Sequence, residues 1–251
     1  MNNNIFQEPI DHILTRAGFC SLRSASSFIK NNKIFINCKK VSARNQNADI
    51  ENDIISVNET VLPQQKHIYL MMNKPLNYVC STVSDSHKTV YSLIPDKIKN
   101  SLNGAVLHTI GRLDADSTGL LLFTTNGRLS NYFTNPAYHV EKTYLVGLKN
   151  AASTEEQFLY KNAFSTGITL PEYKHGSAFT TKPAEIQFTD EKNCIILISE
   201  GKFRQIRRMI YALGNEVTAL KRIKMGGIAM PDDLSEGEFV EIGRESFAEC
   251  V

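Results

Sequence analysis

The sequence of 251 residues contains no tryptophan and only five cysteines, which are widely scattered: Cys20, Cys38, Cys80, Cys194 and Cys250. None of them forms a C-x-x-C pair, and the six histidines show no H-x-x-x-H or H-x-H spacing. Scattered thiols are typical of reduced intracellular proteins, whereas disulfide frameworks and zinc sites need regular spacing. We therefore expect neither a disulfide nor a bound metal.

Long apolar stretches are also missing. No uninterrupted run approaches the ~20 residues that a membrane-spanning helix requires. The first residues, MNNNIFQEPI, lack the basic and apolar regions of a secretory signal. These absences predict a cytoplasmic protein with no membrane partner.

Neither sign of charge dominates the whole chain, whose formal net charge is +2. The distribution is uneven, because the segment 200–224 holds seven basic and only two acidic side chains. A concentrated positive segment suits a polyanion such as a nucleic acid. A solvated helix face is the alternative interpretation, and charge alone does not separate the two.

Residues 1–60 have the pattern of a small domain that can fold alone. Apolar residues spaced i, i+3, i+4, i+7 predict a helix over 10–18, and Ser21 is expected to cap a second helix. Two short strands are also expected, at 33–37 and 53–58. The polar stretch 61–66 is expected to be a linker.

Residues 67–251 show a different pattern, dominated by strands. Runs rich in large apolar and β-branched residues predict strands at 67–75, 119–125, 142–148, 182–189, 194–199 and 237–242. Helices are expected at 127–136 and 202–215. This pattern predicts an α+β domain built on a large mixed, mainly antiparallel sheet with flanking helices.

One carboxylate stands out in the stretch GRLDADSTGLLLFTTNG, residues 111–127. Asp114 lies two residues after Arg112 and just before an apolar run, where a charge costs free energy unless it is compensated. A structural ion pair and a reactive group both explain such a position. The local pattern leaves these two interpretations open.

Three segments together resemble one family: residues 111–127, EKTYLVGL at 141–148 and EGKFRQIRRM at 200–209. They resemble the signature motifs of pseudouridine synthases of the RsuA/RluB type, and the resemblance runs from about Tyr69 to Phe247. Members isomerise selected uridines in ribosomal RNA by breaking the N-glycosidic bond and rejoining the sugar to C5 of the base. The resemblance implies a redox-neutral reaction that needs no cofactor.

The resemblance implies that Asp114 is the catalytic aspartate and that Arg207 pairs with it. A carboxylate beneath the sugar stabilises or captures the positive charge that develops during cleavage. A cation within about 4–6 Å keeps such a carboxylate ionised. Whether Asp114 attacks carbon or abstracts a sugar proton stays open at this point.

Further roles follow from the same resemblance. Arg112 enters the gap left by the flipped uridine, Tyr144 stacks on the base, and Ile206 closes the other face of the pocket. Without the resemblance, Tyr144 and Ile206 are ordinary core residues and Arg112 a phosphate contact. Lys142 alternates onto the Tyr144 side. The basic residues expected to contact RNA are Lys142, Lys202, Arg204 and Arg208.

Asp116 raises the alternative of a glycosidase with two carboxylates. We favour a supporting role, in which Asp116 bonds nearby backbone N–H groups through a turn.

The first domain resembles the S4 RNA-binding domain. Arg16, Arg23 and Lys30 are its candidate RNA contacts. Because residues 1–60 carry seven basic and six acidic side chains, we expect a weak phosphate grip.

The flanking stretches NKPLNYVCSTVSD and MGGIAMPDDLSEGEF resemble the branch that modifies 16S rRNA of the small subunit. The expected protein is a monomer whose partner is ribosomal RNA, free or in a small-subunit assembly particle. Three alternatives stay open: the same reaction on 23S rRNA, a non-catalytic RNA-binding assembly factor, and a hydrolase that releases uracil.

Overall fold

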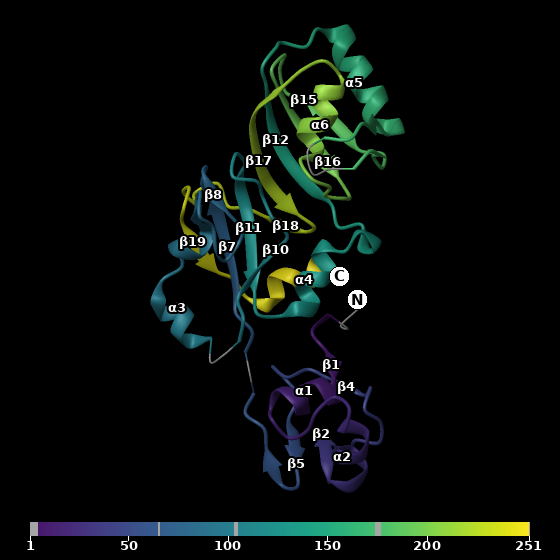
Figure 1. The fold of residues 1–251 in the computed structure, drawn as a ribbon, viewed down its shortest axis with the longest axis vertical. Coiled ribbons are helices and arrows are strands. Elements are labelled where there is room, and N and C mark those ends of the chain that lie inside the picture. Colours follow the sequence, from purple (N-terminus) through teal and green to yellow (C-terminus); the bar gives the residue numbers. More distant parts are fainter. Residues whose placement is uncertain (1–4, 65, 103–104, 174–176, 251) are drawn as a thin grey trace. The chain divides into compact units, whose positions relative to one another are not determined.

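The computed structural model describes residues 5–64, 66–102, 105–173 and 177–250. The chain divides into two compact units between Ile68 and Tyr69 (Figure 1). Each unit has its own arrangement of strands and helices. Among the described residues no helix is long and apolar enough to cross a membrane.

The first unit packs two short helices, α1 (Ile10–Arg16) and α2 (Ala25–Asn31), with a four-stranded antiparallel sheet. The sheet order is β3 (Lys39–Lys40), β2 (Ile34–Ile36), β5 (Ile55–Val57) and β6 (Thr60–Val61). A separate pair joins β1 (Glu8–Pro9) to β4 (Asn47–Ala48). Apolar side chains of α1 and of the strands form its core.

Two boundaries in this unit differ from the sequence prediction. The second helix begins at Ala25, because the hydroxyls of Ser21 and Ser24 accept hydrogen bonds from each other's backbone N–H and form a turn there. Val61, expected in the linker, ends strand β6. Asn58 and Glu59 both have positive φ, as a tight hairpin turn between β5 and β6 requires.

The second unit is built on a nine-stranded sheet. Seven strands follow the order β15 (Glu185–Phe188), β16 (Asn193–Ile198), β12 (Lys142–Leu148), β17 (Val217–Met225), β11 (Thr118–Thr124), β7 (Tyr69–Lys74) and β19 (Phe239–Glu241). Two more strands, β10 (His108–Ile110) and β18 (Ile228–Ala229), pair with β11 and β17. Among the described strands of this sheet, only β11 and β17 pair in parallel, which confirms the predicted mixed, mainly antiparallel α+β architecture.

Helices flank this sheet at both ends. Figure 1 shows α5 (Thr154–Thr166) and α6 (Gln205–Ala212) beside the half that contains β15 and β16, and α4 (Gly127–Thr134) beside β10. The smaller elements are α3 (Asp96–Ser101), the strand pairs β8 (Tyr78–Val79) with β9 (Lys88–Thr89) and β13 (Thr169–Leu170) with β14 (Phe179–Thr180), and the 3-10 helices η2 (Val90–Leu93), η3 (Pro136–Tyr138) and η4 (Arg244–Cys250).

Strands β11 and β17 approach very closely at Gly119. Only two residue pairs, Thr118 with Lys221 and Gly119 with Arg222, join them. Gly119 has a φ of +97°, and a Cβ at this position would lie 2.2 Å from the carbonyl oxygen of Arg222. The Arg222 side chain completes the contact, since its Nε donates to the Leu120 carbonyl at 2.8 Å. Glycine is therefore required where the two halves of the sheet join.

We predict that Gly119→Ala lowers the free energy of unfolding by about 2 kcal/mol or more, because it adds a backbone clash to a strained φ. Thermal or urea denaturation measures the loss. Gly127→Ala is the matched control, since nothing lies within 4 Å of its added Cβ. A Gly119→Ala protein as stable as this control would contradict the requirement.

Candidate active site

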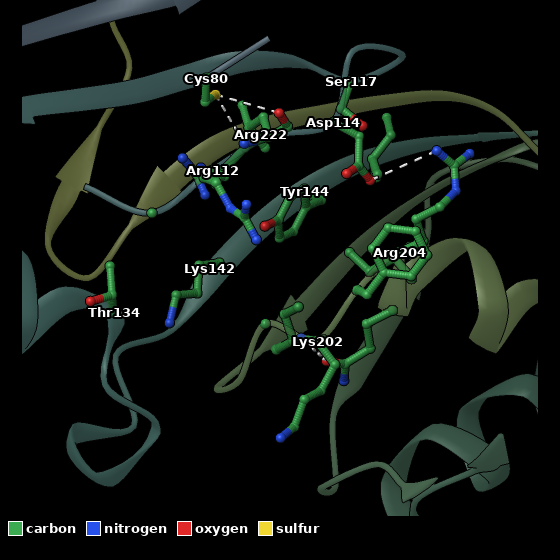
Figure 2. Close-up of a pocket in the computed structure, with 18 of the residues that line it drawn as sticks. Cys80, Arg112, Asp114, Ser117, Thr134, Lys142, Tyr144, Lys202, Arg204 and Arg222 are labelled. Carbon is green, nitrogen blue, oxygen red and sulfur yellow. Dashed lines mark hydrogen bonds and ion pairs between the residues drawn. The ribbon is translucent and has the colours of Figure 1, made fainter. Parts of the chain in front are cut away.

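A cleft of about 520 Å³ opens in the second unit (Figure 2). Its walls come from the loop before β11, from β12 and β17, and from the segment that leads into α6. The sequence separations are large, so only the folded sheet brings these segments together. Asp114, Tyr144 and Ile206 all line it.

The loop that carries Asp114 is held from below by Lys74, the last residue of β7. The Lys74 side chain is fully buried, and its Nζ donates to the carbonyl oxygens of Ser117 at 2.7 Å and Pro75 at 3.0 Å. Burial lowers the pKa of Lys74. A buried ammonium with two carbonyl acceptors fixes the end of the loop.

Cys80 and Asn77 hold the same loop at two further points. The Cys80 thiol accepts from the Leu113 N–H at 3.3 Å and donates to the Leu113 carbonyl at 3.4 Å. Burial raises the pKa of Cys80, which keeps the thiol protonated and able to donate. Asn77 donates its N–H to the Ala115 carbonyl at 2.8 Å from a left-handed φ of 64°, which asparagine tolerates.

Arg204, and not Arg207, is the cation beside Asp114. The Arg204 Nη1 lies 4.0 Å from Asp114 Oδ2, and its Nη2 lies 2.6 Å from Asp116 Oδ2. Partial burial alone would lower the pKa of Arg204, but the hydrogen bond and charge of Asp116, with a smaller contribution from Asp114, raise it overall. Arg207, the predicted partner of Asp114, interacts with it through its charge but forms no ion pair with it within 4.0 Å in the described part of the chain. Arg204 is engaged by carboxylates where a phosphate contact was predicted.

Arg207 instead holds the backbone of the loop. Its Nη2 donates to the Asp116 carbonyl at 2.7 Å and its Nη1 to the Val217 carbonyl at 2.9 Å. Its Nε lies 3.4 Å from Asp116 Oδ2, and burial lowers the pKa of this arginine. Arg207 is not among the described residues that line the cleft, and it acts on Asp114 through its charge and through its hydrogen bond to the loop.

The carboxylate of Asp116 bonds arginine side chains and not the backbone N–H groups that we predicted. The reason is that the left-handed backbone of Arg204, with a φ of 49° at the N-cap of α6, brings its guanidinium to this carboxylate. Asp116 is not among the residues that line the cleft, whereas Asp114 is. This difference separates the two carboxylates and disfavours the two-carboxylate glycosidase interpretation.

Tyr144 and Lys142 project from the same face of β12 into the cleft. Tyr144 is 8% exposed, and Ile206, in the first turn of α6, is 3% exposed. Figure 2 shows Tyr144 between Asp114 on one side and Lys142, Arg112 and Arg222 on the other. The cleft thus has a carboxylate end and a cationic end, with an aromatic ring between them.

Lys142 is buried at the cationic end. Its Nζ donates to the Val140 carbonyl, and burial together with the nearby charge of Arg222 lowers its pKa to about 8. Arg222, which is directly opposite Tyr144 on β17, is 3% exposed and lines the cleft.

The other predicted RNA contacts divide into two groups. Arg112 and Lys202 line the cleft, and Lys202 is exposed. Arg208 is buried, and its Nη2 donates to the carbonyls of Pro171 at 2.6 Å and Ser177 at 3.0 Å. These bonds, with the guanidinium lying over the Phe179 ring, make Arg208 a structural residue, which corrects its predicted RNA contact.

Comparison with known proteins decides the family. The sequence pattern of the family described as "RNA pseudouridylate synthase" matches residues 68–212, more than half of the chain. The chain belongs to this family.

Named relatives and one solved structure agree with this pseudouridylate synthase assignment. A protein of Haemophilus influenzae named "Ribosomal small subunit pseudouridine synthase A" is 36% identical over 90% of this chain and 92% of its own length. The protein of that name from Escherichia coli K12 is 37% identical over 80% and 81%. A crystal structure of a pseudouridylate synthase matches with a TM-score of 0.66 and 31% identity, over 97% of this chain and 100% of that one.

In the first unit of this synthase, the three candidate RNA contacts differ in their exposure and in their ion pairs. Arg16 forms an ion pair with Glu8. Arg23 and Lys30 are exposed.

Sequence reasoning missed three residues of the synthase site: Lys74, Cys80 and Arg222. Lys74 ends a strand that is buried throughout, and Arg222 follows the buried Leu220 two residues later in β17, but Lys221 and Lys224 beside it obscure this pattern. Nothing in the sequence indicates that the Cys80 thiol binds the backbone of Leu113.

Among the described residues, no three histidine, cysteine or acidic side chains lie close enough together to form a metal site.

The lowered pKa of Lys142 makes a prediction about stability. The folded state holds this proton less tightly than the unfolded state, whose ordinary pKa is 10.5, so folding is penalised below pH 8 and the penalty fades as the pH rises from 8 to 10.5. Lys142→Met should therefore raise the free energy of unfolding by about 2 kcal/mol at pH 7 and by nothing above pH 10.5. Denaturation of both proteins across this range measures the difference; a variant less stable than the native protein at pH 7 would contradict it.

Proposed function

We propose that this synthase converts one uridine of small-subunit 16S rRNA into pseudouridine. The observation that carries the proposal is the carboxylate of Asp114 in the wall of a 520 Å³ cleft, with the Arg204 guanidinium 4.0 Å away. The relatives named for the ribosomal small subunit support the choice of RNA.

The reaction begins with extrusion of the target nucleotide, because a base inside a paired stack is out of reach of a side chain. Arg112 fills the gap in the stack. The flipped base lies on the Tyr144 ring, and Ile206 covers its other face. An aromatic platform of this kind contributes about 1–3 kcal/mol per base.

Asp114 then acts on the sugar. Its carboxylate captures C1′ or removes a sugar proton as the glycosidic bond breaks, and either step requires the ionised form. The Nη1 of Arg204 lies 4.0 Å from this carboxylate. Arg207 positions Asp114 by holding the Asp116 carbonyl, and its charge also interacts with the Asp114 carboxylate.

The first unit serves as an S4-like RNA-binding domain in this proposal. Support comes from its two helices on a small sheet and from the exposed Arg23 and Lys30. The Haemophilus influenzae relative aligns over 90% of the chain, which includes part of this unit. Residues 67–251 form the catalytic domain, and Lys202 at the cleft contacts phosphate.

In this proposal the enzyme acts in the cytoplasm as a monomer. Its substrate is 16S rRNA, free or in a small-subunit assembly particle. Sedimentation of the purified protein tests the monomer.

The direct test of the target is to map pseudouridine in 16S and 23S rRNA from cells with and without the gene. We expect one 16S position to lose its modification. Loss of pseudouridine at a 23S rRNA position would instead identify large-subunit RNA as the substrate. No loss of pseudouridine in either RNA would favour a non-catalytic assembly factor. Release of free uracil by the purified protein would indicate a hydrolase.

We predict that Asp114→Asn lowers the rate of pseudouridine formation by at least about 100-fold while RNA affinity is retained, because the amide keeps the shape and removes the charge. Asp96→Asn, an exposed carboxylate on α3, is the matched control. Equal loss of binding and activity would count against the assigned role.

Lys202→Ala should weaken binding to all RNA sequences alike and flatten the dependence of log K on log salt by about 0.7, the contribution of one phosphate contact to a single strand. Lys149→Ala removes another exposed lysine, one that is paired with Glu216, and should leave the slope unchanged. An unaltered slope in the Lys202 variant would exclude that lysine from the RNA interface.

A further inference from the structure

The cationic end of the cleft has no carboxylate partner. Among the described residues, Arg112, Lys142 and Arg222 form no ion pair. Asp114 and Glu200 are the carboxylates among the lining residues. Asp114 lies across Tyr144, at the other end (Figure 2). Oε1 of Glu200 is already bound, since it accepts from the Lys182 N–H at 2.9 Å and the Gln205 amide at 2.8 Å.

Two of these cations are also removed from water. Lys142 is 9% exposed and Arg222 is 3% exposed. The Nη2 of Arg222 is buried and has no hydrogen-bond partner, although the Nε of the same side chain is bound to Leu120. Buried charges without a counter-ion cost free energy, so this arrangement is expected where a negative charge appears at some stage of the function.

The proposed reaction produces such a charge. When the N1–C1′ bond breaks, its electron pair stays with the base, which becomes a uracil monoanion with charge spread over N1, O2 and O4. The carboxylate of Asp114 takes C1′ or the sugar proton. In the second half, C5 supplies the electron pair for the new bond to C1′, and Asp114 leaves C1′ or returns the proton to the sugar. The C5 proton is lost to solvent, and N1 regains a proton. Atoms and charge balance without another reactant.

The direction of the cleft matches this charge. A nucleoside whose sugar lies at Asp114 and whose ring lies on Tyr144 points the far edge of the base toward Lys142 and Arg222, because Tyr144 lies between the two ends. We propose that Lys142 and Arg222 bind the carbonyl edge of the departing uracil and stabilise its anion. This inference rests on the proposed function and adds two catalytic residues to it.

Fixed charges of this kind act most strongly where the charge develops during the reaction. They therefore favour the transition state over the bound substrate, whose base is neutral. The lowered pKa of Lys142 is consistent with an amine that has no anion bound beside it. A negative charge bound there would raise this pKa again.

The test compares uridine with 5-fluorouridine at the target position under single-turnover conditions, with loss of the original nucleoside as the signal. 5-Fluorouracil is the stronger acid and the better leaving group, so it depends less on help from the enzyme. We expect Lys142→Met and Arg222→Met each to slow uridine cleavage about 100-fold with RNA affinity unchanged, and to slow 5-fluorouridine cleavage at least tenfold less. Lys149→Met, an exposed lysine just beyond β12, should change neither rate.

Equal slowing of both substrates would overturn the proposal, because a purely structural role does not distinguish leaving groups. Unchanged rates would overturn it as well. If Arg222→Met fails to fold after losing its bond to Leu120, Lys142→Met decides, and Arg222→Lys, which retains the charge, should keep more activity than Arg222→Met wherever both fold. A native protein that forms no pseudouridine would instead overturn the proposed function itself.

Discussion

The close approach of two parallel strands at Gly119 is the constraint on which the rest of the second unit depends. It joins the half of the sheet that holds β12 and β16 to the half that holds β7 and β19. The same contact places the Asp114 loop, which precedes β11, next to Arg222 on β17. A side chain at position 119 would push these strands apart and separate the two ends of the cleft.

The two ends of the cleft differ in the solvent exposure of their charged side chains as well as in the sign of the charge. The carboxylate end is partly open, with Asp114 and Arg204 at 37% and 29% side-chain exposure. Two of the cations at the other end are buried, and each donates to a backbone carbonyl: Lys142 to that of Val140 and Arg222 to that of Leu120. The partly exposed carboxylate is accessible from solvent, whereas the buried cations can contact only a group that has entered the cleft.

The motifs were sufficient to predict which segments meet, but not how their side chains pair. Tyr144 lines the cleft because inward and outward residues alternate along β12, a regularity visible in the sequence. Arg204, and not Arg207, forms the ion pair with Asp114 because of the left-handed backbone of Arg204 just before α6. No rule of composition or spacing predicts a positive φ at an arginine. The sequence did not predict helix α5, because the exposed Phe158 and Leu159 interrupt the pattern of its polar face. It did not predict strand β17, because the basic residues there indicated a surface segment.

Strand β17 lies in the middle of the sheet but follows β7, β11, β12 and β16 in the sequence. During synthesis β7, β11, β12 and β16 therefore emerge before the strand that joins them, and each half of the sheet waits with an open edge. Contacts between residues so distant in sequence form slowly. A chain that ends before residue 217 lacks the strand that holds Arg222, so the cleft of the second unit is complete only once β17 has been made.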